Sequence, residues 1–543
     1  MTKSYHLMRS RTHRLSSNNT NDGLWDMISV SDKMPRKRNV NGISSSTRSS
    51  KSVSKPATSK TPHSSHTLMV IYGCCLVILA ILLYEYQHIL ISSFGNLKFY
   101  LGIDKRNSPL KPGGWRLADA DTLKLYNTSI CTIDRQFAHE INEHDFENIY
   151  RHKKPLILCF KNGADDWTLS ERWSIESLQK EYGDWDVMSG NSREIVRHGG
   201  TGYIQASFSN YIEDIMYDKD SVGEPMYIFD RDFYNDSSLP STLKPPKYLK
   251  IEDGVDDSIF FLGMSGSGVS FHKHADAWNG VIYGRKRWFL FPLEKTPPGG
   301  VYPGFTQQEW YRRIYPLVKP EDKMLECIQE AGEILYLPES WYHGTINLGD
   351  TVAIGIQKKE ANTHIEKLFY REGKVAKTLR NKNRTEKLNI MKERLKILEE
   401  ILHLLPDSAE VNMKVGTMYK DIGNLHEAKR FTDRALELDQ NFVVALLNLA
   451  GIESQLGNME AAIEHYKQSE LIAPNLWDVY AQYGDFLLNN GQASEAVVIY
   501  KKGTVLEPDF LPLWTQLRHA QLMAEDKQGA ESSLKEINRI KNN

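Results

Sequence analysis

Hydrophobic and polar positions divide the chain into stretches with different patterns. Residues 1–66 are rich in Ser, Thr, Asn, Lys and Arg and hold no sustained apolar run. Such a segment buries too little apolar surface to offset the entropy lost on ordering, so we expect a disordered tail. Residues 67–84 form an uncharged, mostly apolar run of 18 residues. As a helix this run would span about 27 Å, the core of a thin bilayer, and it predicts a single transmembrane helix.

Charge on the two sides of this run predicts its orientation. The tail contains 12 Lys or Arg residues against three Asp, and few basic residues follow the run directly. Because positive charge stays on the cytosolic side, we expect the tail in the cytosol and the later domains in a lumen, after a stem over residues 85–109. A cleaved signal peptide would instead start near the first residue. We therefore predict a single-pass type II protein of the endoplasmic reticulum membrane, with the Golgi as the alternative.

Three Asn-X-Ser/Thr triplets follow the predicted span, at Asn127, Asn235 and Asn383. This triplet accepts N-linked glycans in the secretory pathway, so the three asparagines are predicted glycosylation sites. They agree with a luminal position for the second part of the chain.

The five cysteines are too few for a disulfide-built scaffold or a Cys-rich zinc array. Cys131, Cys159 and Cys327 follow the predicted span and would meet oxidising conditions, where at most one internal pair forms. Cys159 lies in an apolar run and is predicted to be a simple buried thiol. Whether Cys131 pairs with Cys327 stays open at this point.

Between residues 110 and 360, short apolar runs alternate with Gly, Pro and other turn residues. This pattern predicts an all-β barrel or sandwich decorated by helices, with helical stretches near 134–150 and 174–182. The predicted strands are 155–160, 225–230, 258–264, 280–284, 287–292, 333–338 and 351–356.

Composition and charge exclude one class of partner. Lys and Arg number 67 and Asp and Glu 69, a net charge of −2. No basic field therefore favours nucleic acid, and we expect none as a partner.

The last third of the chain repeats every 34 residues, most clearly at Gly416, Ala450 and Gly484. A small residue at such positions lets one helix approach the next closely, and this period is that of a two-helix unit. The pattern resembles tetratricopeptide repeats and predicts an all-α solenoid whose concave groove holds a client protein or peptide. The units are 409–442, 443–476, 477–510 and a degenerate 511–543. Residues 361–408 are predicted to be a solvated, basic helical linker.

Three histidines are the candidate chemistry of the middle region. His272 and His274 are two residues apart, so on a strand they would face the same side. His343 comes 69 residues after His274. Two donors on one strand and one on a distant strand leave several positions of a metal ion open on one side. A His-x-His pair alone is more often a surface or core pair.

The residues around these histidines resemble a known family. The order His272-x-His274, then Gly284-Arg-Lys-Arg-Trp-Phe-Leu-Phe-Pro292, then Ala331-Gly-Glu-Ile-Leu-Tyr-Leu-Pro338 and Trp341-Tyr-His343 is similar to the JmjC family. These are cupin-type double-stranded β-helix proteins, many of which are oxygenases that depend on Fe(II) and 2-oxoglutarate. The resemblance covers residues 110–360, and the stretch around Gly284–Pro292 looks especially like a member of the family from the reticulum lumen.

The resemblance implies a metal site that departs from the family pattern. His272 and His343 match two ligand positions, whereas His274 stands where the family has Asp or Glu. Asp276 is about 13 Å from His272 along an extended strand, too far to share one ion. Three neutral imidazoles would hold Fe(II) and would also suit Zn(II).

The resemblance also implies a site for the cosubstrate. Lys286 matches a lysine that pairs with the distal carboxylate of 2-oxoglutarate, and Asn279 matches an amide near the same ligand. Gly355 and Val269 depart from the family, since Gly355 replaces a residue with a hydroxyl group.

Two functions follow as hypotheses. The first is an Fe(II)- and 2-oxoglutarate-dependent oxygenase that hydroxylates a protein client recruited by the repeats. The alternative is a catalytically inactive scaffold that binds luminal partner proteins.

Overall fold

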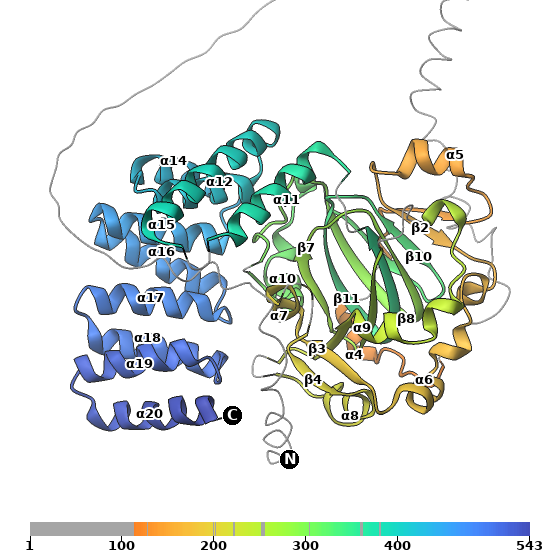
Figure 1. Ribbon diagram of the computed structural model, residues 1–543, viewed down its shortest axis with the longest axis horizontal. Helices are drawn as coiled ribbons and strands as arrows, with labels where there is room; N and C mark the ends of the chain where they lie inside the picture. The colour runs from red at the N-terminus through yellow and green to blue at the C-terminus, as the bar shows by residue number, and fades with distance from the viewer. Residues whose placement is uncertain are drawn as a thin grey trace, which may run out of the picture.

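The computed structural model describes residues 113–542, except for 127–128, 199, 201, 221–222, 251–255, 303, 359–361 and 380–381. The predicted tail, transmembrane helix and stem over residues 1–109 lie outside this part. Within the described residues, no helix is long and apolar enough to cross a bilayer. A strand-rich part, here called the β-domain (residues 113–358), lies beside a stack of helices (Figure 1). The predicted order of a β-domain followed by a helical repeat region is confirmed.

The described part of the β-domain contains a sheet of 11 strands. Nine of them follow the order β1-β2-β10-β8-β11-β6-β5-β3-β4, while β7 pairs with β11 and β9 pairs with β8. The long antiparallel strands β8 and β11 therefore lie at the centre of the sheet. The strands are β1 (Asp134–Phe137), β2 (Leu156–Cys159), β3 (Asp186–Gly190), β4 (Ile204–Ser207), β5 (Tyr227–Asp230), β6 (Asp256–Gly263), β7 (Gly268–His272), β8 (Ala277–Phe291), β9 (Leu325–Gln329), β10 (Ile334–Leu337) and β11 (Tyr342–Lys358).

Two predicted strands, 280–284 and 287–292, are in fact one. Strand β8 runs through both, and Gly284 within it has φ +76°. A Cβ at this glycine would lie 2.3 Å from the carbonyl oxygen of Asp350 on β11. The glycine therefore marks an irregularity inside the strand and not its end.

The predicted helix over 134–150 is wrong in its first part. Asp134–Phe137 is strand β1, which pairs in parallel with β2 at the edge of the sheet. The side chain of Arg135 points inward and donates to Glu333 and to the carbonyl of Ile328. Only Glu143–Asp145 (α5) and the π-helix Phe146–Tyr150 are helical. This long-range pairing overrides the local preference for helix.

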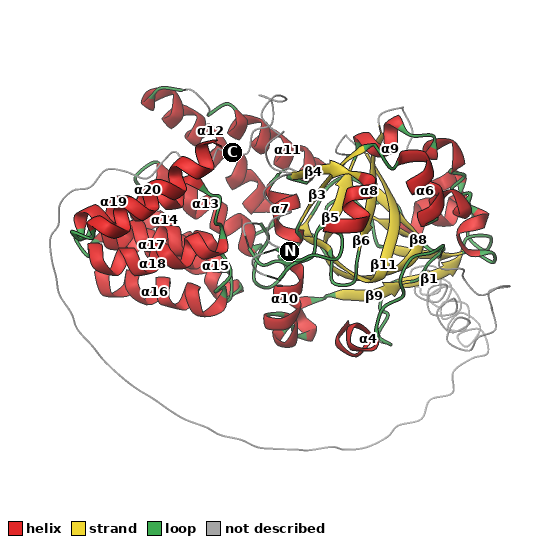
Figure 2. Cartoon of the chain, turned by 90° about the horizontal axis from the view of Figure 1, so that it is seen from below, coloured by secondary structure: helices red, strands yellow, loops and turns green. Residues whose placement is uncertain are grey.

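Further helices cover the strands, and the predicted helix over 174–182 is observed (Figure 2). Both views place α7 and α10 between the strands and the helical stack. These helices are α4 (Ala120–Tyr126), α6 (Ile175–Tyr182), α7 (Ser192–Arg197), α8 (Phe208–Asn210), α9 (Asp232–Asp236) and α10 (Gln307–Arg313).

The repeat region, here called the solenoid, consists of helix pairs with the predicted period. A Cβ at Gly484 would lie 2.5 Å from Tyr500, and one at Gly416 would lie 2.5 Å from the hydroxyl of Thr432, so the small residues do allow close approach. The degenerate unit after residue 510 also forms a helix pair. The helices are α13 (Ala409–Asp421), α14 (Leu425–Leu438), α15 (Val443–Leu456), α16 (Met459–Ile472), α17 (Trp477–Asn489), α18 (Ala493–Leu506), α19 (Leu511–Met523) and α20 (Lys527–Asn542).

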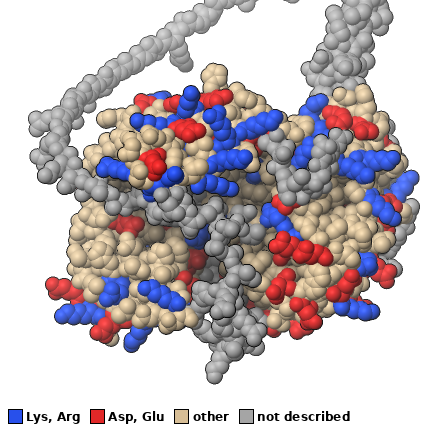
Figure 3. Space-filling view, in the orientation of Figure 1, with Lys and Arg blue, Asp and Glu red and all other residues tan. Residues whose placement is uncertain are grey.

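The linker before the repeats is less solvated than predicted. Its helices α11 (His364–Lys377) and α12 (Arg384–Leu404) share a buried apolar cluster with α13 that includes Leu368, Leu398 and Val411. The basic side chains lie on the outer face, where Figure 3 shows Lys and Arg gathered over these two helices. The linker is thus a packed extension of the solenoid with one charged face.

The β-domain and the solenoid share a core. One continuous buried cluster joins Phe291 on β8 and Trp310 on α10 to Leu447 and Trp477 of the solenoid. Elsewhere, Cys131 and Cys327 form a disulfide. Cys159 is a buried thiol, as predicted, and it donates a hydrogen bond to Glu333.

Candidate metal centre

The pairing of strands β7 and β11 brings the three predicted histidines together. His272 is the last residue of β7, and His343 is its direct partner on the adjacent strand β11. His274 lies two residues after the end of this strand, in the short connection to β8, whereas the prediction had it on the strand itself. One ring nitrogen of each histidine lies within 4.8 Å of those of the other two. Donor atoms this close together could hold one metal ion.

Backbone carbonyls orient all three rings. Nδ1 of His272 lies 2.9 Å from the carbonyl oxygen of Ser270, Nδ1 of His274 2.7 Å from that of Ala275, and Nδ1 of His343 2.9 Å from that of Trp341. Because a carbonyl oxygen only accepts, each Nδ1 carries the proton and each Nε2 keeps its lone pair. Metal-binding histidines are held in this way.

The site keeps these rings neutral. Burial, together with the neighbouring His274, lowers the pKa of His272 to about 3. Burial also lowers the pKa of His274 and, with the two other rings, holds that of His343 well below its usual range. Neutral imidazole is the form that binds a metal ion.

Asp276 is engaged elsewhere, in agreement with the prediction that it is no ligand. Its carboxylate accepts from the hydroxyl of Tyr336 and the backbone N–H of Glu339, and it pairs with His152. His274 thus replaces the carboxylate of the expected ligand set.

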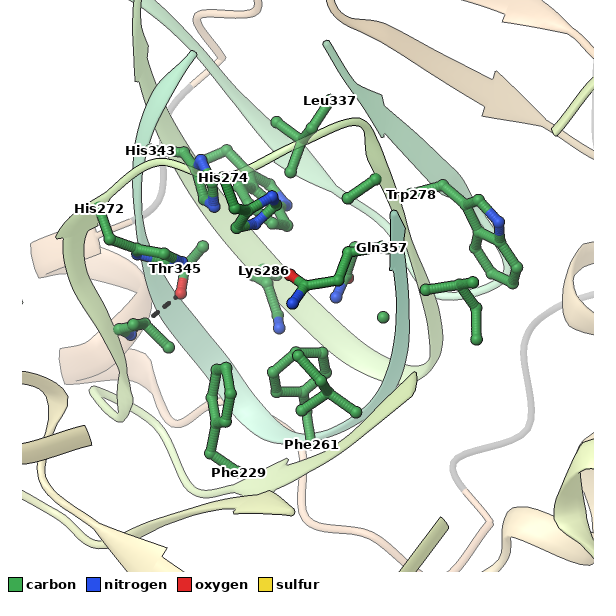
Figure 4. Close-up of a pocket in the computed structure, with 17 residues that line it drawn as sticks. Phe229, Phe261, His272, His274, Trp278, Lys286, Leu337, His343, Thr345 and Gln357 are labelled. Atoms are coloured by element: carbon green, nitrogen blue, oxygen red, sulfur yellow. Dashed lines mark hydrogen bonds between the residues drawn. The ribbon is translucent and has the colours of Figure 1, made fainter. Parts of the chain in front are cut away.

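The histidines line one side of a pocket of about 460 Å³, including its mouth. Figure 4 shows Lys286 between the histidines and Phe261, and Asn279 also lines the pocket. Lys286 is 2% exposed, and its ammonium lies 4.6 Å from the centre of the Phe261 ring and donates to the hydroxyl of Tyr227 at 3.0 Å.

Lys286 is a buried cation without an ion pair among the described residues. Burial lowers its pKa to about 7. The carbonyl oxygen of the Asn279 side chain is also buried and has no hydrogen-bond partner within the described part of the chain. Both groups are placed to contact a polar ligand in the pocket.

The residues that depart from the family pattern lie in the same pocket. A Cβ at Gly355 would lie 2.7 Å from the ring of Phe261, so that ring occupies the space of a larger side chain. Val269 lines the pocket nearby. Sequence reasoning missed Thr345 and Gln357, which also line it. Thr345 is two residues after His343 on the same strand. Because residues at this interval face the same side of a strand, its position relative to His343 was the signal that could have identified it.

Two of the three predicted glycosylation sites are in the described part. Asn235, in α9, and Asn383 are exposed. The side-chain oxygen of Asn383 accepts the backbone N–H of Glu386 and caps helix α12. Asn127 lies outside the described residues.

Each of the two parts of the chain is similar to known proteins. A family model described as a cupin-like domain matches residues 142–356, and one for tetratricopeptide repeats matches 409–442 and 443–476. JmjC domain-containing protein 8 of Homo sapiens is 32% identical over 246 residues, which are 45% of this chain and 88% of that protein.

Other relatives carry names of enzymes. The bifunctional arginine demethylase and lysyl-hydroxylase psr-1 of Caenorhabditis briggsae is 27% identical over 41% of this chain and 60% of its own length. The 2-oxoglutarate and iron-dependent oxygenase JMJD4 of Gallus gallus is 33% identical over 18% of this chain and 26% of its own. Together with the strand-rich fold and the histidine cluster, these matches show that the chain belongs to the cupin-like JmjC-domain family and carries tetratricopeptide repeats after that domain.

Proposed function

We propose that the protein is an Fe(II)- and 2-oxoglutarate-dependent oxygenase that hydroxylates a side chain of a protein client. His272, His274 and His343 would hold the ion, and their three free Nε2 atoms fit a divalent metal. When bound, the ferrous ion and 2-oxoglutarate supply the oxidising chemistry. The names of the demethylase, hydroxylase and oxygenase relatives support this class of reaction.

The chain's own residues would bind and orient the cosubstrate. Lys286 would pair with its distal carboxylate, since an anion compensates the buried charge. The Nδ2 group of Asn279 would donate a hydrogen bond to the ligand, while its Oδ1, the unpartnered atom, would need a donor such as a water molecule. The rings of Phe261 and Trp288 surround the ammonium and keep water away from it. The solenoid would recruit the client, because repeats of this type bind proteins and peptides.

One observation carries the proposal: a buried lysine without an acidic partner among the described residues shares a pocket with three histidines whose rings each bring one nitrogen within 4.8 Å of the other two. A purely structural core would gain nothing from an unpaired ammonium there.

Succinate release tests the proposal. The full-length protein with Fe(II), 2-oxoglutarate, oxygen and candidate clients should release succinate, and His343→Ala should abolish it. His465→Ala, which changes a histidine in the solenoid, should leave it unchanged. Equal succinate release by the wild type and His343→Ala would exclude an oxygenase that uses this site.

A scaffold without turnover is the second candidate, and Gly355 favours it. The ring of Phe261 fills the space where the family has a hydroxyl-bearing side chain, and His274 replaces the carboxylate ligand. The site would then bind a metal, Fe(II) or Zn(II), for stability. In that case His343→Ala would leave the capture of clients by the solenoid unchanged, and no succinate would form.

We further propose that the β-domain and the solenoid lie in the lumen of the endoplasmic reticulum, or of the Golgi, anchored by residues 67–84. The disulfide between Cys131 and Cys327 supports an oxidising compartment. The exposed Asn235 and Asn383 are accessible to glycosylation.

A further inference from the structure

The residues that flank the metal-binding histidines in sequence point away from the pocket and reach helices outside the β-domain. Lys273 lies between His272 and His274, and its ammonium donates to Glu366 of α11 at 2.9 Å. Both side chains are 12% exposed, and the ammonium lies 3.5 Å from the centre of the Phe369 ring on the same helix. The His-x-His segment is therefore tied to α11 through a largely buried ion pair.

The third histidine has an equivalent connection. Tyr342 directly precedes His343, and its hydroxyl donates to Glu410 of α13 at 2.5 Å. Glu410 is buried and also pairs with Lys414, one turn later, at 2.5 Å. The start of β11 is thus held by the first helix of the solenoid.

A third connection runs through the turn after β10. The backbone N–H of Ser340 donates to the carbonyl oxygen of His274 at 3.0 Å. The neighbouring Glu339 accepts from the backbone N–H groups of Asn362 and Thr363, where α11 begins. Both histidine segments therefore contact α11 or α13 on the side opposite the pocket.

We propose that helices α11 and α13 support the metal centre from outside the pocket. Lys273 and Tyr342 would be positioning residues that hold the histidines in place and so set the affinity for the metal ion. The inference rests on the metal-binding part of the proposed function. Its physical basis is that loss of one partner leaves a largely buried oxygen of the other without its hydrogen bond, so the segment moves to relieve that cost. A ligand set tolerates shifts of only about 0.5 Å.

The test measures binding of Co(II) by its visible absorption, and of Zn(II) by competition, in the full-length protein. Tyr342→Phe and Lys273→Met each remove one connection without touching a histidine. Tyr500→Phe is the matched control, because the Tyr500 hydroxyl donates to Asp485 at 2.5 Å within the solenoid. Lys429→Met is the control for the lysine, which pairs with Glu453 between α14 and α15 at 2.7 Å.

We expect the two site variants to bind Co(II) about tenfold more weakly, as for other residues that support metal ligands, and the controls to bind as the wild type does. Hydrogen exchange of the wild type gives a second readout that needs no substitution. Addition of Zn(II) should slow exchange in α11 and α13 more than in α19 and α20.

The outcomes distinguish the absence of a metal site from the absence of a role for the helices. A wild type that binds neither metal overturns the metal site itself and this inference with it. A wild type that binds, with site variants that bind equally well, overturns only the role of the helices. An equal loss of Co(II) affinity in the site variants and the controls also overturns the role of the helices, because it shows that the substitutions destabilise the protein in general.

Discussion

Lys286 has an unfavourable environment for a charged side chain. Its ammonium is surrounded by the rings of Phe261 and Trp288 and by one neutral hydroxyl, that of Tyr227. Desolvation disfavours the charged form, and the pKa is lowered to about 7. Such a residue weakens the empty protein and is useful only when a ligand compensates its charge.

Lys286→Met should therefore stabilise the empty protein. Between pH 7 and about 10.4 the unfolded chain binds more protons than the folded one, so the wild-type free energy of unfolding rises with pH in this window. The variant lacks this slope and should gain up to about 4 kcal/mol at pH 7, with a smaller gain at pH 9. Urea unfolding at both pH values measures the difference. A variant less stable than the wild type at pH 7 would contradict the assignment.

Binding of 2-oxoglutarate should depend on pH in the opposite sense. The ligand needs the ammonium, which is the minor form of the empty site above pH 7. The affinity of the wild type should then fall about tenfold per pH unit above this value, with uptake of close to one proton per ligand at pH 8. Calorimetry in buffers of different ionisation enthalpy measures this uptake. At pH 6 the site is already charged, and uptake should vanish.

The contrast between two helical glycines shows what the repeat pattern encodes. Gly484 faces the ring of Tyr500 in the partner helix, whereas the space around Gly373 in α11 is open to a distance of 4 Å. Only the first belongs to the 34-residue period. The period therefore identifies the positions where helices touch.

Gly484→Ala should destabilise the solenoid although Ala is the better helix former. The new methyl group would lie 2.5 Å from Tyr500, and overpacking of this kind costs about 1–3 kcal/mol. Gly373→Ala is the matched control and should stabilise by about 0.5–1 kcal/mol, the difference in helix propensity. The melting temperatures of both variants, compared with that of the wild type, measure these changes in stability. A stabilising Gly484→Ala would show that the helices are further apart than described.

The two domains are joined by buried charge as well as by the shared apolar cluster. Arg193 of α7 is 4% exposed, lies 3.5 Å from Glu507 and donates to the carbonyl of Asn475. Burial raises the pKa of Glu507 to about 7. A contact of this kind makes the β-domain and the solenoid one cooperative unit.

Arg193→Ala should separate their unfolding. Removal of the guanidinium leaves Glu507 without this ion-pair partner and the carbonyl of Asn475 without this hydrogen bond, and should cost about 1–3 kcal/mol. Calorimetry should then resolve two transitions where the wild type has one. A control exists in Arg434→Ala, since this arginine forms exposed pairs with Asp407 and Glu437 and should change little. A single transition in both variants would show that the apolar cluster alone couples the domains.

Membrane topology has its own test. In cells, Asn127→Gln, Asn235→Gln and Asn383→Gln should each remove one glycosidase-sensitive shift in mobility, because the luminal side alone carries the transferase. No shift in the wild type would place these residues in the cytosol. A substitution at Asn383 also removes the cap of α12, so Thr385→Ala is the cleaner variant at that site.

The local pattern of residues determined much of this protein. Short apolar runs between turn residues predicted β2, β5, β6, β8, β10 and β11, and the period of 34 residues predicted the repeat units, because both depend on which side chains are buried. The family resemblance also identified His272, His274, His343, Lys286 and Asn279 before any coordinates.

Only the tertiary structure decided how these residues act. Local sequence cannot show that β1 joins the sheet in place of a helix, that Gly284 lies inside a strand, or that α11 packs with the solenoid, because each depends on partners far away in the chain. The same holds at the site. Three features arise from long-range pairing, which no local pattern contains. They are the pairing of His343 with His272, the isolation of Lys286 from carboxylates among the described residues, and the contacts of Lys273 and Tyr342 with residues 93 and 68 positions away in the chain.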